Sequence, residues 1–375
     1  MMNTALYHTL QETAARNGGG MSFAEFMHLA LYAPGLGYYS AGLPKLGPQG
    51  DFITAPEISP LFSQCLALQC QQILSPLVDG CILELGAGSG KMAAEIIRTL
   101  SKHDALPKYY YILEVSADLR QRQQVYLQAE CPDFFANILW LDRLPEKPFN
   151  GIILGNEVID AMPVHLFQIN DNHEVSEGYV SKIANTWQCT FRTPFTPGLK
   201  EAVHQLQQRL PEPLSAGYTS EINLRLEPWL ASLRDCLAQG VMIFLDYGFP
   251  SHEYYHPSRS MGTLMCHFRH RAHPQPFENI GLQDITAHVD FTALALAAQN
   301  CQLTIAGFTH QCAFLLSNGL LSLAENMPQS YLLSQQVQQL IQTHEMGELC
   351  KVMALSSNFD EPLQGFTLLD HRYRL

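Results

Sequence analysis

Three glycines spaced two residues apart, Gly86, Gly88 and Gly90, form the motif in this sequence that most clearly suggests chemistry. They follow an apolar run, 81–85, and precede a segment with helical periodicity, so they occupy a strand-to-helix turn. Glycines at such a turn let the chain reverse tightly and let the backbone approach a ligand closely. We therefore expect this loop to hold a nucleotide-like cofactor.

Two carboxylates near the glycine loop indicate which cofactor binds. Glu84 lies two residues before the first glycine, where it would repel a pyrophosphate but attract the ammonium and sulfonium of S-adenosylmethionine (SAM). Glu114 ends the next apolar run, one strand-and-helix step along the chain. A carboxylate there accepts hydrogen bonds from ribose hydroxyls, whether the nucleoside belongs to SAM or to NAD. Glu84 thus favours SAM, and a nicotinamide cofactor is the alternative.

Residues after the next strand are candidates for the adenine end of the same site. Trp140 and Leu141 follow the third strand and could flank the adenine, although core packing of Trp140 is an equal alternative. The expected cofactor residues on the sheet are Glu84, Gly86, Ala87, Gly88, Gly90, Glu114, Val115, Trp140, Leu141 and Asn156.

A loop rich in glycine and proline, 44–57, is a candidate lid over the cofactor. It mixes polar and aromatic groups with stiff Pro and Gly positions and leads into a helix. We expect Asp51, Thr54 and Pro56 to contact the cofactor from this loop, and an ordinary helix entry is the alternative.

The fourth strand ends in polar side chains that are candidates for the reaction itself. Asn156, Glu157 and Asp160 follow its apolar run, at the sheet edge where open α/β sheets bind ligands. Buried carboxylates near a transferable methyl group would neutralise a cationic amine or guanidinium, orient its nitrogen and accept a proton. The alternative is that Asp160 caps a helix and Glu157 only contacts the cofactor.

His288 is a further catalytic candidate, because it lies in a polar loop that enters a helix. In the alternative interpretation the loop residues Asp284, Thr286 or Asp290 are helix caps. A group of potential metal ligands lies just upstream, at Cys266, His267, His270 and His273. Their spacing fits no standard zinc pattern, so we expect no metal.

Alternating apolar runs and helical segments predict the elements that position these residues. Strands alternating with helices indicate a parallel sheet covered on both faces, so the predicted fold is α/β with a Rossmann-like sheet. The tail predicts a terminal antiparallel strand pair, which is usual in SAM-dependent methyltransferases. We divide the chain into an N-terminal helical segment with the lid loop (1–78), the first part of the SAM-binding core (79–163), an insertion with an antiparallel meander plus helices (164–240), a core strand (241–249), a helical insertion (250–347) and the terminal strand pair (348–375).

The composition is that of an acidic globular protein. Of 375 residues, 47% are hydrophobic and 15% charged, and the formal net charge is −13. Such a surface repels phosphate backbones, so we expect no nucleic-acid partner. The sequence predicts no membrane span, and its N-terminus lacks the apolar block of a signal peptide. Ten cysteines without a C-x-x-C pair indicate reduced cytosolic thiols.

The sequence resembles the MidA-like family of class I methyltransferases, which includes a mitochondrial complex I assembly factor that dimethylates an arginine. The matching blocks are "FAEFMHLALYAPGLGYYS", "GDFITAPEISPLF", "LELGAGSGKMA", "GNEVIDAMPVHLF", "VMIFLDYGF", "GTLMCHFRHR" and "QDITAHVDF". The resemblance implies SAM binding by Gly86, Gly88 and Glu114. It also implies an active-site strand end at Asn156 and Glu157.

The activity that the resemblance implies is protein-arginine methylation of a partner such as a respiratory complex I subunit. Because the chain lacks a mitochondrial presequence, we expect a bacterial cytosolic enzyme. The sequence departs from the family pattern at Val158, where an aromatic is common, and at Ser63, where glycine is common. An assembly protein that retains SAM without turnover is the alternative function, followed by a nicotinamide-dependent oxidoreductase. The oligomeric state is left open.

Overall fold

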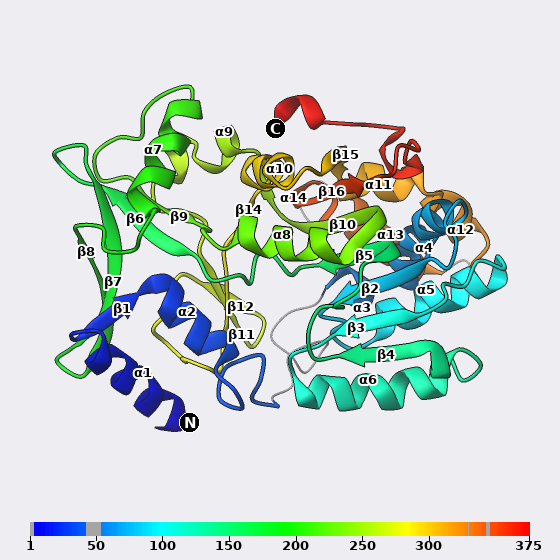
Figure 1. Cartoon of the computed structure of the whole chain (residues 1–375), viewed down its shortest axis with the longest axis horizontal. Coiled ribbons are helices and arrows are strands. Elements are labelled where there is room, and N and C mark those ends of the chain that lie inside the picture. The colour runs from blue at the N-terminus through cyan, green and yellow to red at the C-terminus, as the bar shows by residue number, and fades with distance from the viewer. Residues whose placement is uncertain (1–3, 43–53, 329, 343–345) are drawn as a thin grey trace.

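The computed structural model describes residues 4–42, 54–328, 330–342 and 346–375. Within these ranges the chain forms an eight-stranded sheet, a five-stranded sheet and a three-stranded sheet. The eight-stranded sheet and its helices make up the right half of Figure 1, which we call the core half. The two smaller sheets lie in the left half, which we call the antiparallel half.

The eight-stranded sheet has the order β15-β16-β10-β5-β2-β3-β4, and β14 pairs with the end of β10. The paired strands are parallel except at β16, which runs antiparallel to both β10 and β15. The predicted parallel sheet with helices on both faces is confirmed. Its strands are β2 (Cys81–Leu85), β3 (Tyr110–Leu113), β4 (Ile138–Leu141), β5 (Phe149–Asn156), β10 (Leu237–Phe249), β14 (Val289–Asp290), β15 (Thr304–His310) and β16 (Cys350–Ser357).

The side chains of successive residues in each strand point to opposite faces of this sheet. On β2, Ile82 packs in one hydrophobic cluster and Leu83 in the other. Each buried aliphatic side chain of this kind contributes roughly 1.5–3 kcal/mol to stability. The helices on the first face are α4 (Pro60–Leu74), α5 (Lys91–Lys102), α6 (Ala117–Glu130), α11 (Gln311–Ser317), α12 (Leu320–Glu325), α13 (Tyr331–Ile341) and α14 (Met346–Leu349), and those on the second are α8 (Leu226–Cys236) and α10 (Phe291–Asn300).

The antiparallel half contains the N-terminal segment as well as the first insertion. Met21 pairs with Val180, so the N-terminal strand joins the inserted sheet and does not stand apart as a separate helical segment. Ser22 caps the helix that follows by accepting a hydrogen bond from the backbone N–H of Glu25. The elements are α1 (Thr4–Arg16), β1 (Gly20–Ser22), α2 (Phe23–Tyr32), β6 (His165–Ile169), β7 (Val175–Ile183), β8 (Thr186–Arg192), α7 (Leu199–Arg209) and β9 (Thr219–Ile222).

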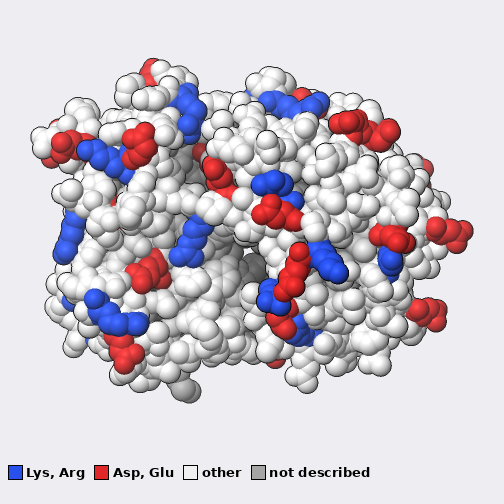
Figure 2. Space-filling model, in the orientation of Figure 1, with Lys and Arg blue, Asp and Glu red and all other residues white. Residues whose placement is uncertain are grey.

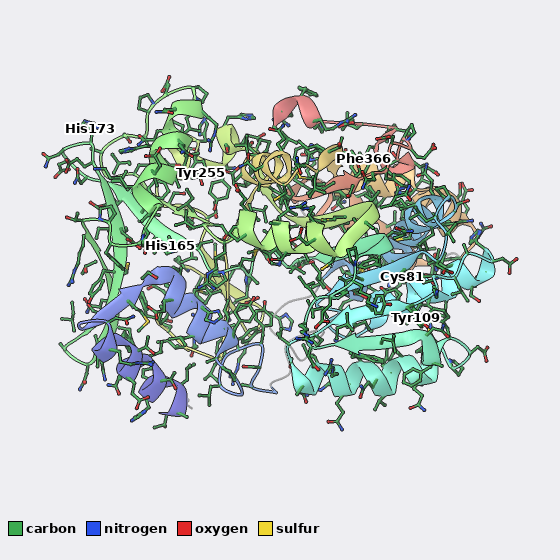
Figure 3. The ribbon with its side chains drawn as sticks, in the orientation of Figure 1. Cys81, Tyr109, His165, His173, Tyr255 and Phe366 are labelled. Carbon is green, nitrogen blue, oxygen red and sulfur yellow. The ribbon has the colours of Figure 1, made fainter. Side chains whose placement is uncertain are left out.

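The segment 250–347 is less helical than its sequence suggested. It contributes a short sheet to the antiparallel half and the core strand β15 to the other half. Side chains fill both halves, with Cys81 and Tyr109 labelled in the core half and His165 and Tyr255 in the antiparallel half of Figure 3. The remaining short elements are α9 (Ser251–Tyr254), β11 (Met265–Phe268), β12 (Arg271–His273) and β13 (Asp284–Thr286).

The C-terminal segment provides one strand instead of the expected pair. The antiparallel neighbours of β16 are β10 and β15, and both precede it in the chain. The residues after β16 form a short 3-10 helix, Gln364–Phe366, and pack onto the sheet edge through apolar side chains. The Phe366 ring occupies the space where a Cβ at Gly307 would lie, so this segment packs over β15.

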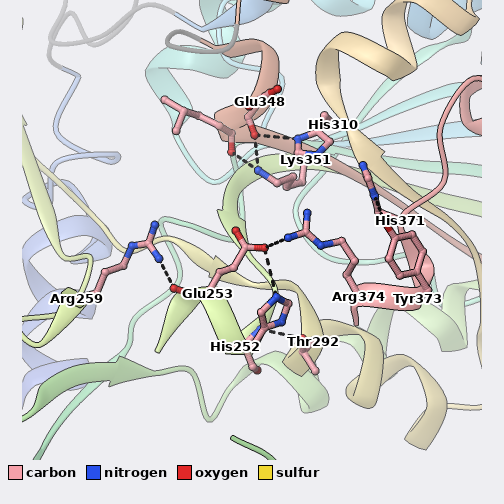
Figure 4. A network of polar contacts seen from close by, with 12 residues as sticks. His252, Glu253, Arg259, Thr292, His310, Glu348, Lys351, His371, Tyr373 and Arg374 are labelled. Atoms are coloured by element: carbon pink, nitrogen blue, oxygen red, sulfur yellow. Dashed lines mark hydrogen bonds and ion pairs between the residues drawn. The ribbon is translucent and has the colours of Figure 1, made fainter. Parts of the chain in front are cut away.

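Arg259, Lys351 and His288 surround the ring of Phe249, the last residue of β10. Together with Arg374, which pairs with Glu253, we call them the basic cluster. Figure 4 shows most of its contacts: Arg374 pairs with Glu253 at 2.6 Å, and Arg259 donates to the Glu253 carbonyl. Lys351 Nζ donates to the carbonyls of Glu348 and Leu349. These bonds tie the C-terminal residues to α9 and to the end of the core sheet.

No helix within the described residues is long and apolar enough to span a membrane.

Candidate active site

A cavity of about 400 Å³ lies where the carboxyl ends of β2, β3 and β5 face α2 of the antiparallel half. Its volume is in the range typical of small-ligand sites. Most of the residues expected at the cofactor and reaction sites line it: Thr54, Pro56, Glu84, Gly86, Ala87, Gly88, Glu114, Val115, Asn156 and Glu157. The sheet edge therefore brings the two predicted sites into one cavity.

On the face shown in Figure 2, charges of both signs are interspersed over a mostly uncharged surface.

The glycine loop follows β2 and opens toward the cavity. Gly86 and Gly88 have φ values of 65° and 53°, a left-handed conformation that favours glycine. A Cβ at Gly86 would meet only Val158, at 4.0 Å, so the space in front of this residue is open. Gly90 does not line the cavity. It is the N-cap of α5 with a left-handed φ of 85°, which favours glycine, and a Cβ there would make only ordinary contacts with α6 side chains.

Glu84 is a buried carboxyl at the end of β2. The Tyr110 hydroxyl donates a hydrogen bond of 2.6 Å to its Oε2. Burial raises the pKa of Glu84 to about 7, and the nearby Glu114 carboxylate adds to the effect. A cation in the cavity would favour the ionised form of Glu84.

Glu114 is held at the end of β3 by two donors. The backbone N–H of Ser116 donates to one oxygen at 2.9 Å, and Gln123 Nε2 donates to the other at 2.9 Å. The same Gln123 nitrogen donates to the Gly88 carbonyl at 2.9 Å, so one side chain ties Glu114 to the glycine loop. Both contacts fix the carboxylate beside the cavity.

Trp140 and Leu141 do not line the cavity, contrary to the expected adenine contact. The Trp140 indole N–H donates to Gln123 Oε1 at 3.0 Å, and Leu141 packs in the second hydrophobic cluster. Trp140 therefore orients the side chain that holds Glu114. The sequence could not distinguish this role from direct contact, because both place an aromatic residue at the end of the third strand.

Glu157 lies directly after β5 and lines the cavity. Its φ of 50° is a left-handed value that non-glycine residues rarely adopt. Its backbone N–H donates to the Leu245 carbonyl at 2.8 Å, and its Oε1 accepts a weak bond of 3.4 Å from Asn156 Nδ2. Burial, followed by the Asp246 carboxyl, raises its pKa to about 8.

Asp160 lies behind Glu157 and does not itself line the cavity. Burial and the neighbouring carboxyls of Asp246 and Glu157 raise its pKa well above the usual value. It begins no helix, so the cap interpretation does not hold for it. Among the cap candidates near His288, Asp290 is the one that caps a helix. Its Oδ1 accepts from the backbone N–H groups of Thr292 and Ala293.

His288 is not in the cavity, so the structure does not place it with the other catalytic candidates. Because β14 pairs with the end of β10, the His288 ring stacks on Phe249 with centroids 5.4 Å apart. It lines a separate, smaller cavity of about 60 Å³. Burial, with Arg259 and Lys351 nearby, lowers its pKa to about 4 and keeps the ring neutral.

The lid loop lies partly outside the described residues, and Asp51 is among those that are not described. Thr54 precedes a short helix, α3 (Ala55–Ile58), which borders the glycine loop. Glu57 of this helix accepts from the Ser89 hydroxyl and from Lys91 Nζ, the latter at 2.6 Å. Glu57 was not singled out in the sequence, although it lies in the block "GDFITAPEIS".

A comparison with known families and structures decides the identity of this site. The family described as S-adenosyl-L-methionine-dependent methyltransferases matches residues 65–309. The chain belongs to this family. A solved structure from Burkholderia thailandensis, crystallised with S-adenosyl-homocysteine (SAH) bound, is 38% identical, covers 100% of this chain and 97% of its own, and has a TM-score of 0.93.

More distant relatives carry more specific names. The mitochondrial protein arginine methyltransferase NDUFAF7 homolog of Caenorhabditis elegans is 25% identical over 88% of this chain and 80% of its own length. The human protein arginine methyltransferase NDUFAF7 is 26% identical over 95% of this chain and 82% of its own. The family match and the SAH-bound structure show that this methyltransferase takes SAM as its cofactor, and the nicotinamide alternative is not supported.

The residues of the cavity fit this cofactor. The open space before Gly86, the acid Glu114 beside it and the buried Glu84 provide room, a ribose acceptor and a counter-charge for a cationic nucleoside. In the methyltransferase Glu84 and Glu114 would hold opposite ends of the molecule, and Asn156 and Glu157 would face its reactive end.

The antiparallel half contributes aromatic residues that the sequence analysis missed. Tyr32 and Tyr39 line the cavity with their rings stacked at 5.4 Å, together with His28. The Tyr32 hydroxyl donates to the Ala161 carbonyl at 3.0 Å, and the Tyr39 hydroxyl donates to the Asp284 carboxyl at 2.9 and 3.0 Å. The only sequence signal was their block, "LYAPGLGYYS", because nothing local shows that α2 faces the sheet edge.

Proposed function

We propose that this methyltransferase transfers the methyl group of SAM to a guanidinium nitrogen of arginine in a protein partner. The observation that carries the proposal is a group of four acidic side chains beside the cavity, Glu157, Asp160, Asp246 and Asp284, which we call the acid cluster. The carboxyls of Asp246, Asp284 and Glu157 each raise the pKa of at least one other member. No Lys or Arg is among the described residues that line the cavity.

A guanidinium would bring a positive charge into the cavity. Its planar N–H groups match carboxylate oxygens in pairs, and the pairing is strongest where water is excluded. The stacked rings of Tyr32 and Tyr39 add aromatic surface, which also favours a flat cation. A neutral acceptor would bring no positive charge to the buried Glu157 carboxyl.

The proposed chemistry needs alignment and removal of one proton. SAM supplies a methyl group on a positively charged sulfur. The acceptor nitrogen forms the new N–C bond in line with the breaking S–C bond, whose electron pair remains on sulfur. Glu157 would align the acceptor nitrogen with the breaking S–C bond and take the proton that the guanidinium loses. Asp160 would stabilise the positive charge of the guanidinium.

The names of the distant relatives support a protein substrate, and a subunit of respiratory complex I is our first candidate. We place the reaction in the bacterial cytosol. The cavity lies between the two halves, so an arginine side chain carried by a folded partner can enter where α2 faces the sheet edge.

Labelled SAM tests the proposal directly. The purified enzyme is incubated with methyl-labelled SAM and candidate complex I subunits, and the products are digested and mapped by mass spectrometry. We expect label on arginine in the wild type and none with Glu157→Gln. Label on another residue type would contradict the arginine assignment, and wild-type protein that binds SAH but labels no partner would favour a non-catalytic assembly role.

A further inference from the structure

Asp246 has an unusual place in this site, because it touches the reaction residues from behind without entering the cavity. It lies on β10 next to Leu245, which pairs with Asn156 at the end of β5. The turn after β5 crosses over the end of β10, and the Asp246 side chain, only 1% exposed, sits beneath that turn. It lies in the block "VMIFLDYGF", which was quoted for the family resemblance, but the sequence predicted no role for Asp246 in the site.

One oxygen of Asp246 holds the whole turn. Its Oδ2 accepts hydrogen bonds from the backbone N–H groups of three successive residues, Val158 at 3.2 Å, Ile159 at 2.8 Å and Asp160 at 3.2 Å. Its Oδ1 accepts from the N–H of Tyr247 at 2.8 Å. Three donors that converge on one oxygen are best satisfied by an ionised carboxylate.

The turn held in this way begins with Glu157, whose backbone is left-handed. A non-glycine residue persists in that conformation only when its surroundings impose it. The bond from the Glu157 N–H to the Leu245 carbonyl fixes one side of the residue, and the three bonds to Asp246 fix the other. Together they direct the Glu157 carboxyl into the cavity.

Asp246 also dominates the charge around Glu157. The ionisable groups that act on the Glu157 carboxyl are Asp246 on β10 and Asp284 on β13, and Glu157 acts in turn on Asp160, Tyr247 and Cys350. Lys351 of β16 is the register partner of Asp246, but its ammonium donates to the carbonyls of Glu348 and Leu349. Nothing cationic among these groups offsets the charge of Asp246.

We propose that Asp246 is a positioning residue of the methyltransferase, which sets both the direction of Glu157 and its readiness to hold a proton. The inference rests on the proposed function, in which Glu157 takes the proton from the acceptor. It assigns to Asp246 no contact with SAM or with the acceptor. Removing its charge should therefore change how Glu157 titrates and how fast the enzyme turns over, while leaving cofactor binding nearly intact.

The test compares Asp246→Asn with Asp290→Asn. Asp290 is a matched control, because it is also a buried aspartate that accepts from two successive backbone N–H groups and a hydroxyl, but it caps α10 away from the cavity. Difference infrared spectra recorded across pH follow the protonated carboxyl band of Glu157, assigned by its loss in Glu157→Gln. This titration needs no acceptor, so it remains decisive even if arginine methylation fails.

Loss of a neighbouring negative charge makes the ionised form of Glu157 less unfavourable, so its titration should move to lower pH, by roughly one unit. With an active acceptor, Asp246→Asn should lower kcat by about tenfold or more and change KM for SAM by less than about threefold. Asp290→Asn should lower thermal stability without moving the Glu157 midpoint. An unchanged midpoint in Asp246→Asn, or an equal shift in both variants, would overturn the proposal.

A second measurement uses the wild-type protein, in case Asp246→Asn does not fold. The amide proton resonances of Val158, Ile159 and Asp160 are followed by NMR across the same pH range. If one carboxylate holds all three, they should shift together with one midpoint as Asp246 gains its proton. Independent shifts, or none, would show that Asp246 does not control the turn.

Discussion

Two clusters of ionisable side chains meet at the end of β10 and differ in how their charge is satisfied. Asp246 and Lys351 face each other across β10 and β16 as register partners. The basic cluster around Lys351 is closed, because its cations are bonded to Glu253 and to backbone carbonyls (Figure 4). The acid cluster around Asp246 contains carboxyls that raise one another's pKa values.

The contrast between the two clusters indicates which of them lies at a ligand-binding site. Burying a charge without a partner is costly, and such groups are commonly found at functional sites. The basic cluster has its partners within the protein and stabilises the end of the sheet. The acid cluster borders the SAM cavity, where SAM and a guanidinium would bring positive charge to the Glu157 carboxyl.

The largest expected effect is on the acid side, for Glu157→Gln. Loss of a group that takes a proton from the reacting nitrogen should lower kcat by about 10²–10⁴-fold, while the Kd for SAH changes by less than about threefold. Methyl transfer from labelled SAM and calorimetry with SAH measure the two quantities. Glu221→Gln is the matched control, since this buried glutamate accepts from Thr263 and Leu264 N–H groups in the antiparallel half. Equal loss of activity in both folded variants would contradict the role of Glu157.

Glu114→Ala should weaken cofactor binding by about a hundredfold or more. The carboxylate is expected to accept two hydrogen bonds from the ribose, and bonds to a charged group contribute about 1.5–3 kcal/mol each. Calorimetric titration with SAH measures the loss. The variant should keep its kcat at saturating SAM within about tenfold. SAH affinity equal to that of the wild type would show that the ribose lies elsewhere.

The affinity for SAM should rise with pH by about tenfold between roughly pH 6 and pH 8. Glu84 and Glu157 have pKa values raised from 4.5 to about 7 and about 8, so in the free enzyme both bind protons that a cationic ligand displaces. The same raised values predict that the stability of the free enzyme falls as pH rises through this window, because the folded state binds more protons than the unfolded state.

Calorimetry in two buffers with different ionisation enthalpies checks this linkage, since protons released on binding react with the buffer. SAH lacks the sulfonium charge and should release fewer protons than SAM. Affinity that does not depend on pH, or equal proton release with both ligands, would rule out the acids as the counter-charge for the sulfonium.

The smallest effect on activity is expected on the basic side. Lys351→Met removes the buried ammonium of the basic cluster, and burial already lowers its pKa to about 8. We expect methyl transfer by the folded protein to change by less than about twofold, with lower thermal stability because two carbonyls lose their donor. A loss of turnover comparable to that of Glu157→Gln would mean that the two clusters act as one site.

The sequence predicted the core sheet because its signals are local. Apolar runs, glycine turns and strand-end acids such as Glu84 and Glu114 lie within a few residues of one another, and the carboxyl ends of parallel strands must meet at one edge. The roles of Asp246 and Tyr39 were not predictable in this way. Asp246 acts through a turn 86–88 residues away, and Tyr39 bonds to a carboxyl 245 residues away.

The differences from expectation at His288, Trp140 and the C-terminal strand pair have the same origin. Each residue has the type and the approximate position that the function requires. What decides its role is a long-range contact, the pairing of β14 with β10 for His288 and the Gln123 side chain for Trp140. In the tail, Phe366 packs over β15 where a second strand was expected.

A crystal structure of this enzyme with SAH tests the central claim most directly, namely that the acid cluster faces the reacting end of the cofactor. We expect the ribose hydroxyls on Glu114, the amino group near Glu84 and the sulfur directed toward Asn156 and Glu157. A sulfur atom directed away from Glu157, with the acid cluster buried behind the adenine, would contradict the account.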